Sequence, residues 1–219
     1  MTVDREMPEM AATLVTPGAS EWLALSDDLL AGLVHALNNR VTALSVCAEL
    51  AGLGDLEMEK EGVLQSEVAR LQRVSVLIGC FPARGVAEAL DIGPVVDDAL
   101  AIHSHHPRMR RVECTVQAGG GMQPVRAPRW ALLRLLLVMV DAAKGGAQEA
   151  GRDSMSLQLS SDAECVRLRT DARGSESAYA VELAAVCGGV LLHEPGGLVL
   201  TLPSLLEVRR RERTSRGSM

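Results

Sequence analysis

Residues 30–51 read LAGLVHALNNRVTALSVCAELA, and their pattern decides the fold of the N-terminal part of the chain. Apolar residues recur here in steps of three and four, which is the period of an amphipathic helix. The stripe starts at Leu23, resumes a heptad later, and runs through Leu30, Leu33, Leu37, Val41, Leu44, Ala48 and Ala51. It predicts one long helix with a single apolar side.

A second helical pattern follows the turn residues Gly52 to Asp55. Its apolar positions are Val63, Val68, Leu71, Val74, Leu77 and Ile78, and it stops before Phe81 and Pro82. The two patterns predict a helical hairpin over residues 19–82. Two antiparallel helices leave an apolar seam uncovered, so the hairpin is expected to form a homodimer as an intermolecular four-helix bundle.

Helix and strand signals alternate over residues 88–206. Pro128 stands at the first turn of a predicted helix. Alternating apolar residues around a Pro-Gly-Gly turn at residues 195–197 predict strands. Helices covering one sheet are expected, so the predicted fold class is α+β with two domains. A flexible lead-in (residues 1–18) and a basic disordered tail (residues 207–219) are expected at the two ends.

Composition excludes several classes of partner. The chain has 22 Lys and Arg against 28 Asp and Glu, a net charge of −6, so no basic field favours nucleic acid. No basic segment leads into an apolar stretch at Met1, and the apolar run around residues 130–140 is too short to span a bilayer, so a cytoplasmic protein without membrane contact is expected. The 5 cysteines are scattered and never spaced as CxxC, which indicates neither disulfides nor zinc.

His35 is the main candidate for chemistry. It lies two positions from Leu33 and from Leu37, which rotates it roughly 200° from the apolar stripe, so it is expected to face solvent. A neutral imidazole with a pKa of about 6.5 is a nitrogen nucleophile that can carry a phosphoryl group. Asn39, one turn later, could orient a water or a phosphoryl oxygen. The alternative is a surface histidine without a role.

The segment from His35 to Leu44 resembles the H-box of sensor histidine kinases. In that family the phosphorylated histidine is followed by an acidic residue and a Leu-Asn-Asn-Pro-Leu-Thr-type run, on the first helix of a dimeric hairpin. The matching residues are His35, Leu37, Asn38, Asn39 and Thr42. Residues 125–137 resemble the strand and helix that carry the N-box, and residues 181–203 resemble the closing helix and hairpin. The resemblance implies a phosphotransfer hairpin followed by a Bergerat-type ATPase fold.

The departures from this pattern bear on activity. Ala36 stands where the family has the acidic residue that acts as general base. Arg40 replaces the proline and adds a cation that could contact a phosphoryl oxygen or an acidic partner. Leu137 stands where a magnesium-binding asparagine is expected, and Asp141, where the second would be, is a weak remnant at most.

The phosphate-binding loops of the family are missing. Residues 171–174, Asp-Ala-Arg-Gly, are the remnant of a glycine box, and the last helix starts too soon to leave room for an ATP lid. The resemblance therefore implies a degenerate ATPase-like domain without a bound cofactor or metal. His103, His105 and His106 lack Cys or Glu companions at metal-binding spacing, so a polar helix end is preferred to a metal site.

These expectations favour a histidine phosphotransferase of a two-component phosphorelay. His35 would accept a phosphoryl group from the aspartyl phosphate of a response-regulator receiver domain and pass it to another receiver. The receiver supplies Mg²⁺. Docking is expected on Leu37, Asn38, Arg40 and Val41. The alternatives are a phosphatase, a non-catalytic module that regulates a response regulator or a kinase by binding and, least favoured, an ATP-dependent histidine kinase.

Overall fold

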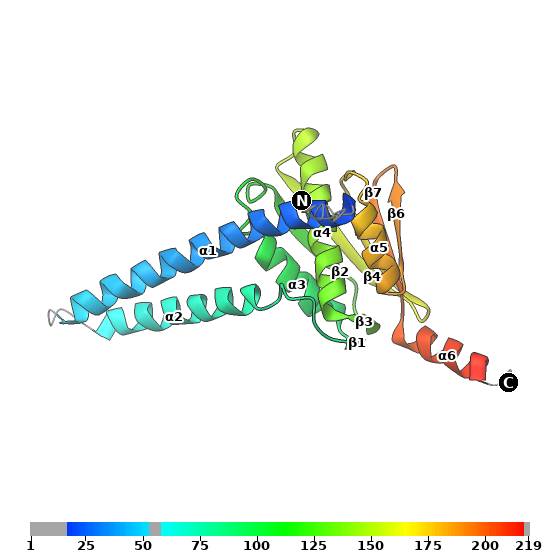
Figure 1. Ribbon diagram of the computed structural model, residues 1–219, viewed down its shortest axis with the longest axis horizontal. Coiled ribbons are helices and arrows are strands. Elements are labelled where there is room, and N and C mark those ends of the chain that lie inside the picture. Colours follow the sequence, from blue (N-terminus) through cyan, green and yellow to red (C-terminus); the bar gives the residue numbers. More distant parts are fainter. Residues whose placement is uncertain (1–16, 53–57, 217–219) are drawn as a thin grey trace, which may run out of the picture.

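The computed structural model describes residues 17–52 and 58–216 as a helical hairpin that projects from an α/β body (Figure 1). Its elements in chain order are α1 (Pro17–Gly52), α2 (Met58–Ile78), β1 (Ala87–Leu90), α3 (Ile92–His103), β2 (Glu113–Ala118), β3 (Val125–Pro128), α4 (Arg129–Glu149), β4 (Ser154–Ser161), β5 (Cys165–Thr170), α5 (Ala178–Val186), β6 (Val190–Glu194), β7 (Gly197–Pro203) and α6 (Leu205–Arg216). The fold is therefore α+β, as predicted.

Helices α1 and α2 form the predicted hairpin. Helix α1 has 36 residues, which gives it a length of about 54 Å at the α-helical rise. Arg40 Nη1 on α1 lies 2.9 Å from Glu67 Oε2 on α2, and Arg70 donates to Glu67 at 2.6 Å. The hydrogen bond from Arg40 lowers the pKa of Glu67. A buried carboxylate near the middle of α2, with two guanidinium partners, thus ties the two helices together.

A five-stranded sheet forms the layer of the body that lies away from the hairpin (Figure 1). Its strand order is β2-β4-β5-β7-β6, with β2 parallel to β4 and the other neighbours antiparallel. Along β4, Met155, Leu157 and Leu159 are buried, so alternate side chains point into the core. Strands β1 and β3 pair separately as a short antiparallel ribbon.

The root of the hairpin belongs to the same hydrophobic core as the body. Four buried side chains of α1 (Trp22, Leu25, Leu29 and Leu33) and two of α2 (Val74 and Leu77) pack in one cluster with α3, α4 and α5. The predicted domains at 19–82 and 88–206 thus share a core at their junction. Apolar periodicity predicted a covered side of α1, but the body covers its root and leaves its outer half exposed.

The four aromatic residues of the chain gather at this junction. Trp22 lies 6.2 Å from Phe81 and 6.1 Å from Tyr179, measured between ring centroids. The Arg134 guanidinium sits 4.6 Å from the Trp22 centroid and 5.5 Å from that of Trp130. Arg134 also donates to the Phe81 carbonyl at 3.0 Å. Cation–π and aromatic contacts therefore link α1 to α4 and α5.

The C-terminal segment differs from its prediction. The basic tail, expected to be disordered from residue 207, is helical in α6 as far as Arg216. The Ser204 hydroxyl accepts from the Glu207 backbone N–H at 3.1 Å, and Glu207 pairs with Arg211 at 2.7 Å. Capping and ion pairs one turn apart stabilise a helix that charge density alone did not predict.

The lead-in predicted for residues 1–18 lies outside the described residues up to residue 16, and α1 begins at Pro17, a favoured first-turn residue.

Within the described part of the chain, the helices are too short or too polar to cross a lipid bilayer.

Gly32 lies at a point where α1 approaches the body closely. A Cβ atom on Gly32 would lie 1.9 Å from the His105 carbonyl oxygen. Gly62 on α2 has nothing within 4 Å of the same position. A methyl group fits at residue 62 but not at residue 32.

We expect Gly32→Ala to lower the free energy of unfolding and Gly62→Ala to raise it. Forcing α1 off the body costs about 1–3 kcal/mol, whereas alanine in an open helix site gains up to about 1 kcal/mol over glycine. Urea denaturation followed by circular dichroism measures both. Equal effects of the two substitutions would contradict the close contact.

Candidate functional site

His35 lies on the exposed surface of α1, on the side predicted from its spacing. Its Nε2 atom is 3.2 Å from Asn39 Nδ2, one helical turn away. An amide nitrogen only donates, so in this arrangement Nε2 accepts and the ring proton is on Nδ1. In this arrangement the Nε2 lone pair is directed at the Asn39 amide, so Asn39 must turn away before Nε2 can act as a nucleophile.

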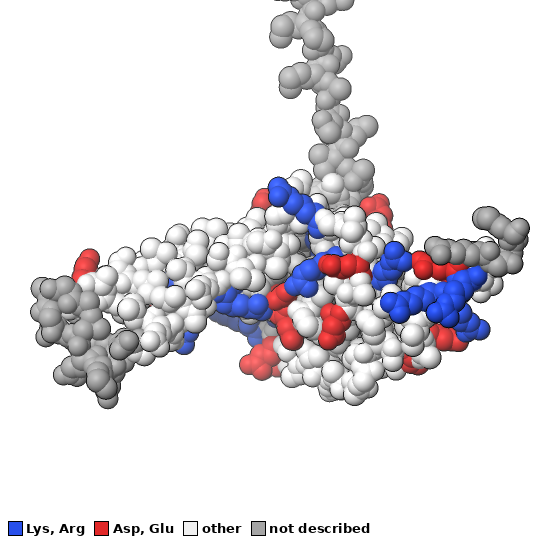
Figure 2. All heavy atoms as spheres, turned by 90° about the horizontal axis from the view of Figure 1, so that it is seen from below, with Lys and Arg blue, Asp and Glu red and all other residues white. Residues whose placement is uncertain are grey.

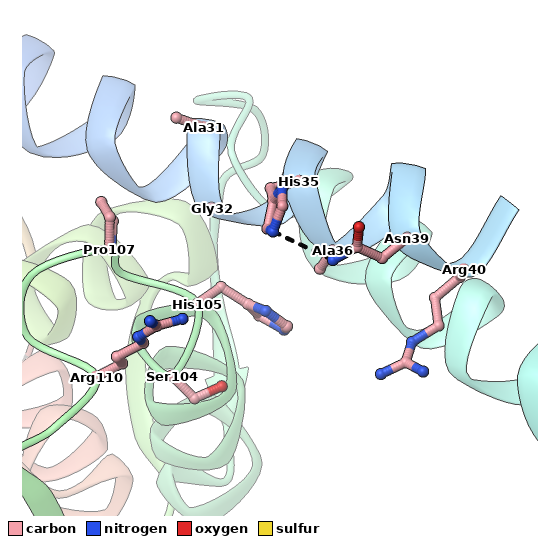
Figure 3. A pocket seen from close by; sticks show the side chains of 10 residues that line it. All are labelled: Ala31, Gly32, His35, Ala36, Asn39, Arg40, Ser104, His105, Pro107 and Arg110. Atoms are coloured by element: carbon pink, nitrogen blue, oxygen red, sulfur yellow. Dashed lines mark hydrogen bonds between the residues drawn. The ribbon is translucent and has the colours of Figure 1, made fainter. Parts of the chain in front are cut away.

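A cavity of about 420 Å³ opens beside His35, between α1 and the loop that follows α3 (Figure 3). Its lining from α1 is Ala31, Gly32, His35, Ala36, Asn39 and Arg40, and its lining from the loop is Ser104, His105, Pro107 and Arg110. These ten described residues include two arginines and two histidines but no Asp or Glu. In a chain of net charge −6, such a lining favours an anion.

The predicted site residues divide between two sides of α1. His35, Asn39 and Arg40 line the cavity, while Leu37, Asn38 and Val41 do not. Asn38 and Val41 are exposed, and Leu37 is half-buried against the hydrophobic core. Arg40 faces the cavity, but its Nη1 atom is engaged by Glu67.

Two cavity residues were missed as site residues from the sequence. His105 was considered only as part of the histidine-rich helix end, and Arg110 was not considered. Both come from the loop after α3, which is far from His35 in the sequence although it lies beside His35 in the structure. The basic run Arg108-Met109-Arg110-Arg111 was the available signal. Burial, and then the charge of Arg40, lowers the pKa of His105.

His103 and His106 are buried, which corrects the expectation of a polar helix end. Their rings stack at 5.1 Å between α1 and α4. Asp141 Oδ1 lies 3.2 Å from His103 Nε2 and 3.5 Å from His106 Nε2. Asp28 Oδ2 on α1 lies 3.8 Å from His106 Nε2 and pairs with Arg108. Carboxylates from two helices compensate this buried polar cluster.

The two positions at which the sequence resemblance implied metal ligands, Leu137 and Asp141, both lie on α4. Leu137 is buried in the core, and the carboxylate of Asp141 is occupied by the two histidines. Within residues 17–52 and 58–216, no group of three or more His, Cys, Asp and Glu side chains could hold a metal ion. A smaller cavity, about 230 Å³, remains beside Asp141, and α1 contributes Glu21 and Asp28 to its wall. His106 and Arg108 also line this cavity, and Arg108 is paired with Asp28, so carboxylates are in excess over cations there.

We expect stability to fall in mild acid because of His106. Burial, and then the charge of His103, lowers the pKa of His106 in the folded protein. As pH falls below about 6.5 the unfolded chain takes up a proton that folded His106 resists, so the free energy of unfolding decreases. Asp28 and Asp141 oppose this shift, and Arg108 adds to it. Denaturation at pH 7.5 and pH 5.5 measures the slope.

His106→Gln should reduce this pH slope, and His193→Gln, at an exposed position on β6, should leave it unchanged. A slope that persists in His106→Gln would show that another group carries the acid sensitivity.

No protein-family model and no curated protein matches the sequence. Among solved structures, the chain is similar to the Acinetobacter baumannii histidine kinase AdeS, with 13% identity, a TM-score of 0.46, and coverage of 78% of this chain and 98% of that one. It is similar to the mycobacterial sensor histidine kinase MprB, with 18% identity, a TM-score of 0.43, and coverage of 54% and 98%. It is also similar to a bacterial phosphotransferase, with 17% identity, a TM-score of 0.39, and coverage of 82% and 95%.

Proposed function

We propose that this chain is a histidine phosphotransferase of a two-component phosphorelay. The observation that carries the proposal is the exposed His35 imidazole, held by Asn39 at the mouth of a cavity whose described lining has cations but no carboxylate. The Nε2 lone pair attacks the phosphorus of a receiver's aspartyl phosphate, the P–O bond to aspartate breaks, and the carboxylate leaves. The reverse step delivers the phosphoryl group to a second receiver.

This reaction requires few catalytic groups from the chain itself. An aspartyl phosphate is a reactive acyl phosphate, and the receiver supplies the Mg²⁺ that neutralises the phosphoryl charge. Once the Asn39 amide releases Nε2, the lone pair is free and the attack needs no general base, because the ring proton is on Nδ1; this is consistent with Ala36 in the place of an acidic residue. Positioning of the two reactants is the main contribution of this protein.

An ATP-dependent kinase is disfavoured by the electrostatics of the body. Glu21, Asp28 and Asp141 surround the cavity left beside α4, and buried Leu137 offers no ligand for a metal. A triphosphate there would meet three carboxylates and the single arginine Arg108, which is already paired with Asp28. A phosphatase, with Asn39 orienting water, and a receiver-binding regulator use the same surface and remain the alternatives.

We infer that the outer half of the hairpin forms the four-helix dimer. Val34, Val41 and Ala48 are exposed on α1 in heptad steps, with half-buried Leu37 and Leu44 between them. Leu64 and Val68 are exposed on α2. Figure 2 shows most of the hairpin arm uncharged on one face, in contrast to the charged body. An apolar seam of this kind favours pairing with a second copy.

The seam divides the roles of the predicted docking residues. Leu37 and Val41 lie on the seam side of α1, so we assign them to the dimer contact. Asn38 is exposed and Arg40 reaches the cavity, so both stay with receiver docking.

Transfer from a phosphorylated receiver tests the relay. Receivers labelled with radioactive acetyl phosphate should place acid-labile, alkali-stable label on this chain. His35→Ala should abolish the label and His193→Ala should retain it, because only the first removes the nucleophile. Lack of transfer from every cognate receiver would contradict the relay and favour the binding module, and label acquired directly from ATP would favour a kinase.

Val41→Glu should convert the dimer to a monomer, because it places a charge in an apolar seam. Val46→Glu is a matched control, since both valines are 49% exposed and five residues separate them, which turns Val46 roughly 140° away from the seam. Light scattering after size exclusion measures the mass. A wild-type monomer, or equal behaviour of the two variants, would contradict the seam.

A further inference from the structure

The cavity beside His35 contains one arginine whose charge is not balanced by a neighbour. Arg40 is paired with Glu67, but Arg110 has no ion-pair partner within residues 17–52 and 58–216. Nearby arginines differ from it, because Arg108 pairs with Asp28, and Arg73 and Arg129 both pair with Asp98. Among the described residues, Arg110 is thus an exposed cation without an ion-pair partner, and its side chain lines the cavity (Figure 3).

The loop that carries Arg110 is held in place on both sides. Buried His106 accepts hydrogen bonds at Nδ1 from the backbone N–H groups of Arg108, at 3.1 Å, and Met109, at 3.3 Å. The Val112 N–H donates to the Met109 carbonyl at 3.2 Å. Toward the hairpin, the His105 carbonyl rests against Gly32. The backbone on either side of Arg110 is therefore fixed relative to α1.

We propose that Arg110 and His105 form a binding site for the tetrahedral phosphoryl oxyanion carried by His35, an inference that rests on the proposed function. The planar guanidinium of arginine matches the spacing of two phosphoryl oxygens and donates two parallel hydrogen bonds. His105 offers an imidazole N–H from the same loop. The side chains of Arg110 and His105 both come from the body, so the hairpin supplies the nucleophile and the body supplies the anion site.

The site acts on the product of each transfer. When Nε2 of His35 bonds to phosphorus and the aspartate oxygen leaves, three non-bridging oxygens stay on the phosphoryl group. Arg40 shares its charge with Glu67, so Arg110 is the cation available to neutralise them. The low pKa of His105 keeps its ring neutral, so it donates one N–H without repelling Arg110. The phosphohistidine should therefore persist longer in this cavity than on an open helix.

Chemical phosphorylation tests the site without a receiver. Phosphoramidate donates its phosphoryl group to histidine with release of ammonia, and the lifetime of phospho-His35 can then be followed by ³¹P NMR. Inorganic phosphate provides a second probe, with the imidazole resonances of His35 and His105 as the readout. Arg110→Gln should weaken phosphate binding and shorten the lifetime by about tenfold, the scale of a lost charge-assisted hydrogen bond. Arg110→Lys should restore part of both.

Arg111→Gln is the matched control, because Arg111 is the next residue, is exposed, and does not line the cavity. It should leave both quantities unchanged. If Arg110→Gln behaves as the wild type, or if Arg111→Gln has the same effect, the anion site is wrong whether or not the relay exists. If receivers never label the chain while Arg110 still governs both probes, the relay is wrong and the anion site stands.

Discussion

The docking of α1 onto the α/β body is the contact on which the rest of the structure depends. It combines a steric fit, in which Gly32 lets the helix backbone reach the His105 carbonyl, with the packing of Trp22 under the Arg134 guanidinium. Neither a larger residue at position 32 nor a shorter side chain at position 134 would keep both. Because the interior packs densely, these two points fix the direction of a helix about 54 Å long.

This docking determines both cavities of the junction. On one side of α1, it brings the loop with His105 and Arg110 opposite His35 and makes a cationic cavity. On another side, it brings Glu21 and Asp28 to Asp141 and makes a cavity in which three carboxylates outnumber the single arginine, Arg108. A single helix thus supports anion chemistry at its histidine and opposes nucleotide phosphates at the body. This charge pattern is consistent with the proposed phosphoryl carrier and is the reason that we disfavour an ATP-dependent kinase.

The sequence predicted what depends on local pattern. Apolar periodicity predicted the hairpin and the exposure of His35, and the alternation of helix and strand signals predicted the α+β class of the body. Contacts between distant segments could not be predicted in this way. The burial of His103 and His106 depends on Asp28 and Asp141, which lie on two helices far apart in the sequence. The role of Gly32 depends in the same way on a loop that no spacing relates to it.

Helix α6 and Arg110 also show that a local sequence pattern does not predict how a charged segment is ordered or paired. Both belong to basic runs, and a basic run taken alone is usually solvated and without a defined partner. In α6, acidic residues one turn away and a serine cap order the run. At residues 108–111, Arg108 forms an ion pair with Asp28. Arg110 lines the cavity and has no ion-pair partner in the part of the chain that the structure describes. The role of a charged side chain therefore depends on which partners the fold places beside it. Among the described residues Arg110 has no ion-pair partner, and it lines the same cavity as His35.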